Sequence, residues 1–223
     1  MHVFINSAMS ADGKISNVRR EQIRISGSED FERVDSLRAE SDAIGVGVGT
    51  VLADDPSLTV KDDKGENPLR VVFDSDARTP TDAGVFEGEG DVVVFVSHDA
   101  ESEEVDRLSE RCEVVRTGRG DDGDQEEEKE RVDLGEAVET LEKMGVERLM
   151  VEGGGGINYS LLREKLVDEI LVYVGASVIG GTGAPTLVDG DGFVDKYPRL
   201  ELGSVERIDE GVLLRWVVDK ESY

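Results

Sequence analysis

The chain alternates short apolar runs with helical patterns, and this rhythm restricts its fold more than any other feature. The apolar runs are rich in β-branched residues and too short for helices, so we expect strands that are covered on both faces. The expected strands are residues 2–6, 43–48, 69–73, 91–96, 148–151, 169–174 and 211–218. The expected helices are residues 28–40, 99–111, 133–144 and 157–166, the first with Ser28 as its N-cap.

This alternation of strands and helices predicts an α/β fold with a mostly parallel sheet. The last part of the chain differs, because its strands follow one another without a helix between them, which indicates an antiparallel edge. The segment "GRGDDGDQEEEKER" at 118–131 is dense in like charges, so we expect a mobile acidic insertion. Because the rhythm resumes after it, residues 1–223 are expected to form one domain.

Charge restricts the partners of the chain. It contains 51 acidic and 25 basic residues, for a net charge of −26. Such a surface repels nucleic acid and anionic membranes, and acidic residues spread along the whole chain are typical of proteins that work in concentrated salt.

The sequence contains one cysteine and two histidines, so it offers neither a cysteine pair for a disulfide nor a cluster of metal ligands. Without a leader pattern or an apolar stretch of about 20 residues, a soluble cytoplasmic protein is expected.

The stretch "VEGGGGIN" at 151–158 places four glycines between an expected strand and an expected helix. Glycine lets backbone N–H groups face a ligand, and a helix N-terminus adds partial positive charge, so the pattern favours a phosphate or dinucleotide site. The alternative is a tight turn that needs glycine only for positive φ, which one or two glycines would satisfy. The stretch matches neither a Walker loop nor a standard Rossmann fingerprint.

A second polar group lies in "GVGVGTVLADDPSLTV" at 45–60. Thr50 and Asp54 are four residues apart, so one helical turn would place both side chains on one face. A hydroxyl and a carboxylate that face one way would hold a ribose or an amide. The alternative is a helix cap followed by an Asp-Pro turn.

Two further loops follow expected strands. "FDSDARTP" at 73–80 presents Ser75 and Arg78, either as a grip on a phosphate or as an ordinary polar loop. "NSAMSADGKIS" at 6–16 gathers polar groups around an Asp-Gly turn, which alone is a weak signal.

The order of these fragments resembles one protein family. The fragments are "INSAMSADGKIS", "VGTVLADDPSLTV", "NPLRVVFDS", "VEGGGGIN" and "LVDEILVYVGASVIGG" followed by "APTLVDGDGF". Together they resemble the riboflavin-pathway pyrimidine reductases, which include stand-alone archaeal enzymes and the reductase half of bacterial deaminase–reductases. The resemblance covers nearly the whole chain apart from the acidic insertion. It implies a dihydrofolate-reductase-like fold: a central, mostly parallel mixed sheet with helices on both faces, an antiparallel carboxyl-terminal edge and, usually, a homodimer.

The resemblance also implies an activity. This is the NADPH-dependent reduction of the ribosyl chain of 2,5-diamino-6-ribosylamino-4(3H)-pyrimidinone 5′-phosphate to a ribityl chain, with NADH as the second choice of cofactor. The alternatives are the deaminated (uracil) substrate, a pterin reduced as by dihydrofolate reductase, and a non-catalytic nucleotide-binding module. The zinc deaminase activity of the bacterial enzymes needs a His/Cys cluster, so it is expected to be absent.

Position by position, the resemblance assigns residues to two ligands. The expected cofactor contacts are Thr50, Asp54, Ser75, Asp76, Ala77, Arg78, Glu152, Gly153, Gly154, Gly155 and Gly156. The expected substrate contacts are Asn6, Asp12, Lys14, Arg33, Leu58 and Lys61, the last as a phosphate contact that replaces an arginine of bacterial relatives. No metal ligand is expected. The bound nicotinamide would supply hydride, and a carboxylate, Glu152 or Asp54, would protonate the ring oxygen or stabilise an iminium. The sequence does not rank the two.

Overall fold

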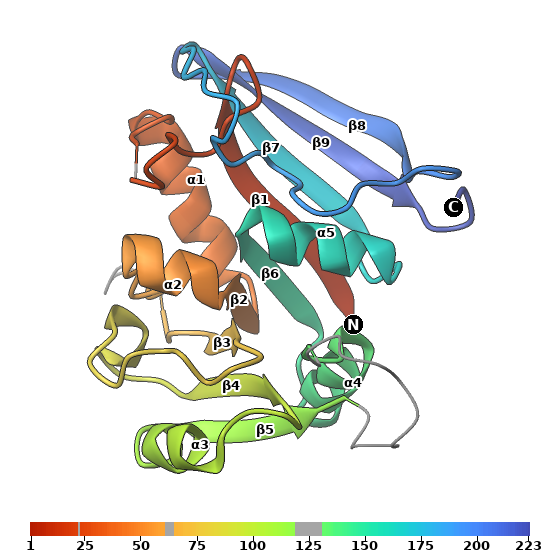
Figure 1. Cartoon of the computed structure of the whole chain (residues 1–223). Helices are drawn as coiled ribbons and strands as arrows, with labels where there is room; N and C mark the ends of the chain where they lie inside the picture. Colours follow the sequence, from red (N-terminus) through yellow and green to blue (C-terminus); the bar gives the residue numbers. More distant parts are fainter. Residues whose placement is uncertain (22, 61–64, 119–130) are drawn as a thin grey trace.

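The computed structural model describes residues 1–21, 23–60, 65–118 and 131–223 (Figure 1). The acidic segment 119–130 and Lys61 therefore lie outside the described residues. The strands are β1 (His2–Ser10), β2 (Ala43–Gly47), β3 (Leu69–Phe73), β4 (Val92–Ser97), β5 (Glu113–Thr117), β6 (Arg148–Gly153), β7 (Glu169–Gly175), β8 (Arg199–Ile208) and β9 (Gly211–Asp219). The helices are α1 (Ser28–Ala39), α2 (Val48–Asp54), the short 3₁₀ helix η1 (Gly84–Phe86), α3 (Ser102–Ser109), α4 (Leu134–Lys143) and α5 (Gly155–Arg163).

These strands form one sheet in the order β5-β4-β3-β2-β6-β1-β7-β9-β8. Every neighbouring pair from β5 to β7 is parallel, and the pairs β7–β9 and β8–β9 are antiparallel. The expectation of a mostly parallel mixed sheet with an antiparallel carboxyl-terminal edge is confirmed. Strand β6 lies between β2 and β1, so segments distant in the sequence meet at the centre of the sheet (Figure 1).

Helices cover both faces of this sheet, as expected. Side chains alternate across a strand, so Val3 and Ile5 belong to one core cluster and Phe4 to the other. Helices α4 and α5 pack on the first cluster, whereas α1, α2 and α3 pack on the second. The near-continuous apolar runs of the central strands follow from this two-sided burial.

Three local differences from the sequence-based prediction stand out. Strand β5 was not expected, because its sequence EVVRT mixes charged with apolar residues at a partly exposed sheet edge. Strand β1 continues to Ser10 because its second half pairs with β7. Helix α5 begins at Gly155 and not at Ile157, since the Asn158 N–H already donates to the Gly154 carbonyl.

The N-terminus of α1 also differs from the prediction. Its N-cap is Gly27, which has no capping side chain, so the assignment of Ser28 as the cap was wrong. The carboxylate of Asp209, in the turn between β8 and β9, accepts hydrogen bonds from the N–H groups of Glu29 at 3.3 Å and Asp30 at 3.1 Å. A residue 180 positions away therefore stabilises this helix end. Across the described part of the chain, no helix is long and apolar enough to span a membrane.

Candidate active site at the carboxyl ends of the strands

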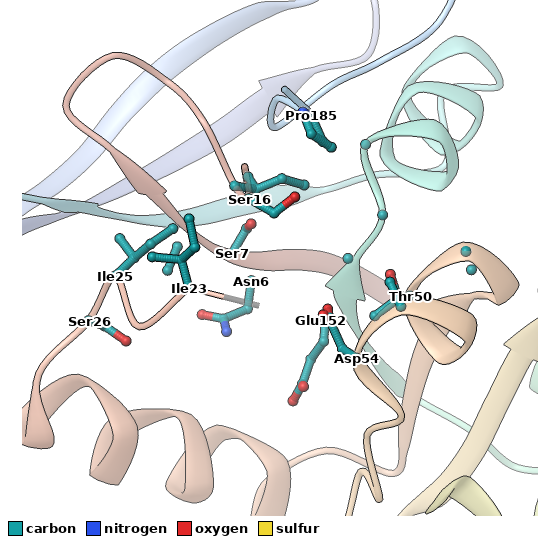
Figure 2. A pocket seen from close by; sticks show the side chains of 18 of the residues that line it. Asn6, Ser7, Ser16, Ile23, Ile25, Ser26, Thr50, Asp54, Glu152 and Pro185 are labelled. Carbon is teal, nitrogen blue, oxygen red and sulfur yellow. The ribbon is translucent and has the colours of Figure 1, made fainter. Parts of the chain in front are cut away.

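A cavity of about 1140 Å³ opens where β1, β2 and β6 end (Figure 2). In parallel sheets this edge is the usual place for a ligand, because loops and helix N-termini converge there. Strand β1 contributes Asn6 and Ser7, helix α2 contributes Thr50 and Asp54, and β6 contributes Glu152. The glycines 153–156 also line the cavity, and Figure 2 shows Ile23, Ile25 and Ser26 on the side opposite Thr50 and Asp54.

Glu152 does not stand alone in this cavity. The Arg38 guanidinium of α1 donates to both of its carboxylate oxygens, from Nε at 2.5 Å and from Nη2 at 2.6 Å. Its Nη1 donates to the Thr59 carbonyl oxygen at 3.0 Å, which fixes the guanidinium plane. Burial lowers the pKa of Arg38, but the hydrogen bond and charge of Glu152 outweigh it, so the pKa is raised overall. Such a bidentate pair uses both carboxylate oxygens as acceptors.

Asp54 lies in a different environment. It shares one face of α2 with Thr50, as the four-residue spacing predicted, and both side chains line the cavity. Within the described residues its carboxylate has no hydrogen bond or ion pair, and burial raises its pKa. The two carboxylates of the site are thus chemically distinct: one engages an arginine and the other faces the cavity unpartnered.

Three of the four glycines at 153–156 are required by the local structure, each for its own reason. Gly153 and Gly154 have positive φ angles of 135° and 99°, which only glycine adopts readily. A Cβ atom on Gly155 would lie 2.6 Å from the Thr186 carbonyl oxygen and 2.7 Å from a carboxylate oxygen of Asp189, so the loop 184–190 packs directly on it. Gly156 meets nothing closer than 4.0 Å.

The glycine loop at 153–156 is suited to binding an anion. The N-cap Gly154 has no capping side chain, and all four glycines line the cavity. The first N–H groups of α5 therefore face the cavity without an intrahelical acceptor, and the helix dipole adds positive charge at the same point. The cradle that these glycines leave open is compatible with the phosphates of a dinucleotide.

The expected substrate residues divide into two groups. Asn6 lines the cavity, and its side-chain oxygen accepts a hydrogen bond from Arg33 Nη2 at 2.9 Å. Arg33 also binds the buried Asp30 at 2.8 Å, so it stabilises the cavity wall from behind. Of the other expected residues that the structure describes, Asp12, Lys14 and Leu58 do not line the cavity. Leu58 is buried in the core, and Lys14 Nζ donates to the Ala184 carbonyl at 3.2 Å.

Asp12 has a structural role in the loop after β7. Its carboxylate accepts from the Ser10 hydroxyl at 2.6 Å and from the N–H groups of Ile179 and Gly180 at 3.0 and 2.7 Å. These bonds lower the pKa of Asp12 to about 2, with the Ser10 hydroxyl as the largest cause. Asp12 thus connects the turn after β1 to the loop that carries Pro185 over the cavity.

The loop after β3 reaches the site through Ser75. A second cavity of about 280 Å³ adjoins the first and shares Gly156 with it. It is lined by Ser75, Arg131 and Arg163, and also by the acidic residues Glu164, Asp189 and Asp191. The other expected residues of this loop line neither cavity. Ala77 is buried, and Arg78 Nε lies 3.7 to 3.8 Å from the carboxylates of Asp76 and Asp74.

Sequence reasoning did not assign several of the residues that define this site. Arg38 follows the helical repeat of α1 and carries no motif, so its contact with Glu152 appears only in the fold. Arg131 and Arg163 gather near Ser75 from segments that the sequence alone cannot bring together. Within the described residues, no group of three or more His, Cys, Asp and Glu side chains is placed to hold a metal ion.

Fold and site together define a class: a dihydrofolate-reductase-like α/β domain with a glycine-lined cavity at the carboxyl edge of its sheet. Comparison with known proteins narrows the class. Residues 1–214 match the family described as the RibD C-terminal domain. The chain is 48% identical over 220 residues to the 2,5-diamino-6-ribosylamino-4(3H)-pyrimidinone 5′-phosphate reductase of Archaeoglobus fulgidus, covering 94% of each chain. The chain therefore belongs to the RibD C-terminal domain family.

Two further comparisons point to the same family. The reductase of the same name from Methanothermobacter thermautotrophicus is 44% identical over 222 residues, covering 97% of this chain and 98% of the relative. Among solved structures, RibD of Acinetobacter baumannii superposes with a TM-score of 0.78 at 25% identity, covering 98% of this chain and 58% of that one.

Proposed function

We propose that this protein reduces the ribosyl chain of 2,5-diamino-6-ribosylamino-4(3H)-pyrimidinone 5′-phosphate to the ribityl chain, with NADPH as reductant. The observation that carries this proposal is the pairing, in one cavity, of a glycine cradle for phosphates with two unlike carboxylates. Membership in a family of riboflavin-pathway reductases implies a nicotinamide cofactor. The two archaeal relatives named for this diamino substrate favour it over the deaminated one.

NADPH is proposed over NADH because of the second cavity. Arg131, Arg163 and Ser75 line it, and it adjoins the glycine loop where the pyrophosphate would lie. Two arginines and a hydroxyl next to a dinucleotide seat suit a 2′-phosphate, which guanidinium groups bind with two parallel hydrogen bonds. Ser75 is the residue of the expected 75–78 loop that supports this placement.

The environments of the two carboxylates support separate roles in the reaction. The bound nicotinamide supplies hydride to C1′ of the substrate. Asp54 faces the cavity without a partner and burial raises its pKa, so we assign it the proton that the ring oxygen takes up when the C1′–O bond breaks. Glu152, held by Arg38, is a fixed negative charge beside the iminium that forms at C1′. Substrate, hydride and one proton then give the ribityl product.

An enzyme assay tests the proposed function. Purified protein is mixed with the diamino substrate and NADPH, and oxidation is followed at the nicotinamide absorbance band. Parallel reactions contain the deaminated substrate, dihydrofolate, or NADH in place of NADPH. We expect the highest kcat/KM for the diamino substrate with NADPH. Absence of oxidation with the authentic substrate would refute the proposed function, and faster oxidation with dihydrofolate would favour a pterin reductase.

The proposal includes a homodimer. Leu202 and Val205 of β8 are 53% and 56% exposed. In the β8–β9 register they oppose Trp216 and Leu214, so the four side chains share one face of the sheet. An exposed apolar face on an edge hairpin is typical of an interface with a second copy. The net charge of −26 argues against nucleic acid and anionic membranes as partners.

A further inference from the structure

The β7 loop, residues 176–190, is fastened to the turn that follows β1. Asp12, in that turn, accepts hydrogen bonds from the N–H groups of Ile179 at 3.0 Å and Gly180 at 2.7 Å. The Ser10 hydroxyl donates to the same carboxylate at 2.6 Å and orients it. Both oxygens of the Asp12 carboxylate are therefore engaged with the first part of the β7 loop or with the residue that orients them.

The same turn also holds the middle of the β7 loop. Lys14 Nζ donates to the Ala184 carbonyl oxygen at 3.2 Å, and the Lys14 backbone forms an antiparallel bridge with Thr186. The Ile15 N–H donates to the Pro185 carbonyl oxygen at 3.0 Å. The turn and the β7 loop are thus connected at two places along the loop.

The far end of the β7 loop packs on the glycine loop. The Asp189 N–H donates to the Gly155 carbonyl oxygen at 2.9 Å, and a Cβ atom on Gly155 would lie 2.6 Å from the Thr186 carbonyl oxygen. The fully buried Asn158 of α5 donates from Nδ2 to the Leu187 carbonyl oxygen at 2.8 Å. The β7 loop, the blue segment that leads from β7 toward β8 in Figure 1, therefore connects the turn after β1 to the expected phosphate seat.

The glycine loop needs support from outside. Glycine has more backbone freedom than any other residue, so a run of four of them at 153–156 loses much conformational entropy when it is fixed. Only the conformation in which its N–H groups face the cavity suits an anion. If that conformation is populated only in part, the apparent dissociation constant of the ligand is the intrinsic one divided by the populated fraction. Contacts that hold the loop in place therefore raise affinity.

We infer that Asp12 and Lys14 are positioning residues for the cofactor, which hold the β7 loop against the glycine loop. This inference rests on the proposed function, in which NADPH lies on the glycine loop. The resemblance assigned both residues to the substrate, but neither lines the cavity. Their contacts instead act through the β7 loop on the seat of the cofactor. They therefore set affinity for NADPH and leave affinity for the substrate unchanged.

The kinetic test is Asp12→Ala. We expect KM for NADPH to rise by about 3- to 10-fold, as for a lost hydrogen-bonded anchor. At saturating NADPH, kcat and KM for the substrate should equal the wild-type values, because the bound cofactor itself selects the ordered loop. Asp12→Asn keeps one acceptor oxygen and should show a smaller rise. Lys14→Met keeps the apolar stem without the donor and should also raise KM for NADPH.

The opposite kinetic pattern would overturn the inference. If KM for the substrate rises in Asp12→Ala while KM for NADPH does not, the turn acts on the substrate. Asp106→Ala is the matched control, because it removes the same charge from an exposed position of α3 that lines neither cavity of the site. Its KM for NADPH should equal that of the wild type. A rise as large as in Asp12→Ala would point to net charge and also overturn the inference.

Hydrogen exchange provides a readout that general destabilisation would not reproduce. In Asp12→Ala, the amides of the β7 loop and of residues 153–156 should exchange faster, whereas those of the central strands β2 and β3 should keep their wild-type rates. Unchanged exchange at 153–156 would show that the β7 loop does not transmit the change and would overturn the inference.

A binding measurement separates this inference from the proposed activity. Titration with NADPH alone, followed by its fluorescence, needs no substrate and no turnover. If the enzyme assay fails with every substrate but Asp12→Ala binds NADPH about 3- to 10-fold more weakly than the wild type, the activity is wrong and the positioning role stands. If both proteins bind NADPH equally tightly, or the wild type does not bind it, the positioning role is wrong.

Discussion

At the scale of single residues, Glu152 and Asp54 show how the fold separates groups that look alike in the sequence. Glu152 lies near the end of strand β6 and Asp54 ends helix α2, and sequence reasoning could not rank the two carboxylates. The contact with Arg38 occupies both carboxylate oxygens of Glu152, because a bidentate guanidinium needs two acceptor oxygens. Nothing local in the sequence marks Arg38, since its partner lies 114 positions away. Asp54 keeps its oxygens free for the cavity within the described residues.

Asp54→Asn tests the proposed proton donor. Burial raises the pKa of Asp54. If the protonated form is the active one, kcat is highest below that pKa and falls as pH rises through it. The variant should lose about 10²- to 10⁴-fold in kcat and should lose this pH dependence, while its affinity for NADPH changes little. The measurement is kcat against pH together with NADPH binding by fluorescence.

Asp55→Asn serves as the control for this prediction. The Asp55 carboxylate accepts from the Gly84 N–H at 2.7 Å and does not line the cavity, and asparagine retains an acceptor oxygen and tolerates its positive φ of 45°. Its pH profile should match that of the wild type. A wild-type rate and pH profile in Asp54→Asn would exclude Asp54 as the acid.

The glycine loop gives a second prediction at this scale. In Gly155→Ala the new Cβ atom would lie 2.6 Å from the Thr186 carbonyl oxygen, a backbone atom that cannot move alone. We expect the free energy of unfolding to fall by about 1–3 kcal/mol, as for other overpacked sites. In Gly156→Ala the nearest atom is 4.0 Å away, so stability should be unchanged or slightly higher. Urea denaturation measures both, and equal losses would contradict this account of the loop.

At the scale of elements, the apolar runs predicted the central strands because two-sided burial leaves a clear pattern. The pattern was weaker where burial is one-sided, and β5 was missed at the sheet edge. The site was predictable as a set of strand ends, because parallel strands bring their carboxyl ends together. Which side chains meet there depends on β6 lying between β2 and β1, an order that no single segment encodes.

The N-terminus of helix α1 is stabilised by Asp209, which lies in the turn between β8 and β9. Asp209→Asn should lower the free energy of unfolding by about 1 kcal/mol, because an amide offers one acceptor where the carboxylate offers two. Asparagine tolerates the positive φ of 49° at this position, so backbone strain does not confuse the result. Thermal and urea unfolding measure the loss. The exposed neighbour Glu210→Gln is the control, and an equal effect there would point to general charge removal instead of capping.

At the scale of the whole molecule, the charge of −26 acts on association. Two copies of so acidic a chain repel each other at long range, and salt screens this repulsion over a Debye length of about 10 Å at 0.1 M ionic strength. The apolar face of β8 and β9 must outweigh it for a dimer to form. The resemblance implies a homodimer, but the face proposed for it depends on the β8–β9 register.

The homodimer proposed on this face is therefore expected to tighten with salt. Sedimentation velocity should show a species of twice the 24.3 kDa chain mass, with a dissociation constant that falls as sodium chloride is raised. Leu202→Lys combined with Val205→Lys places charge in the apolar face and should give a monomer at every salt concentration. Val178→Lys, at a 77% exposed position in the loop after β7, should remain dimeric. A wild-type monomer at high salt, or a dimer of the double variant, would show that β8 and β9 are not the interface.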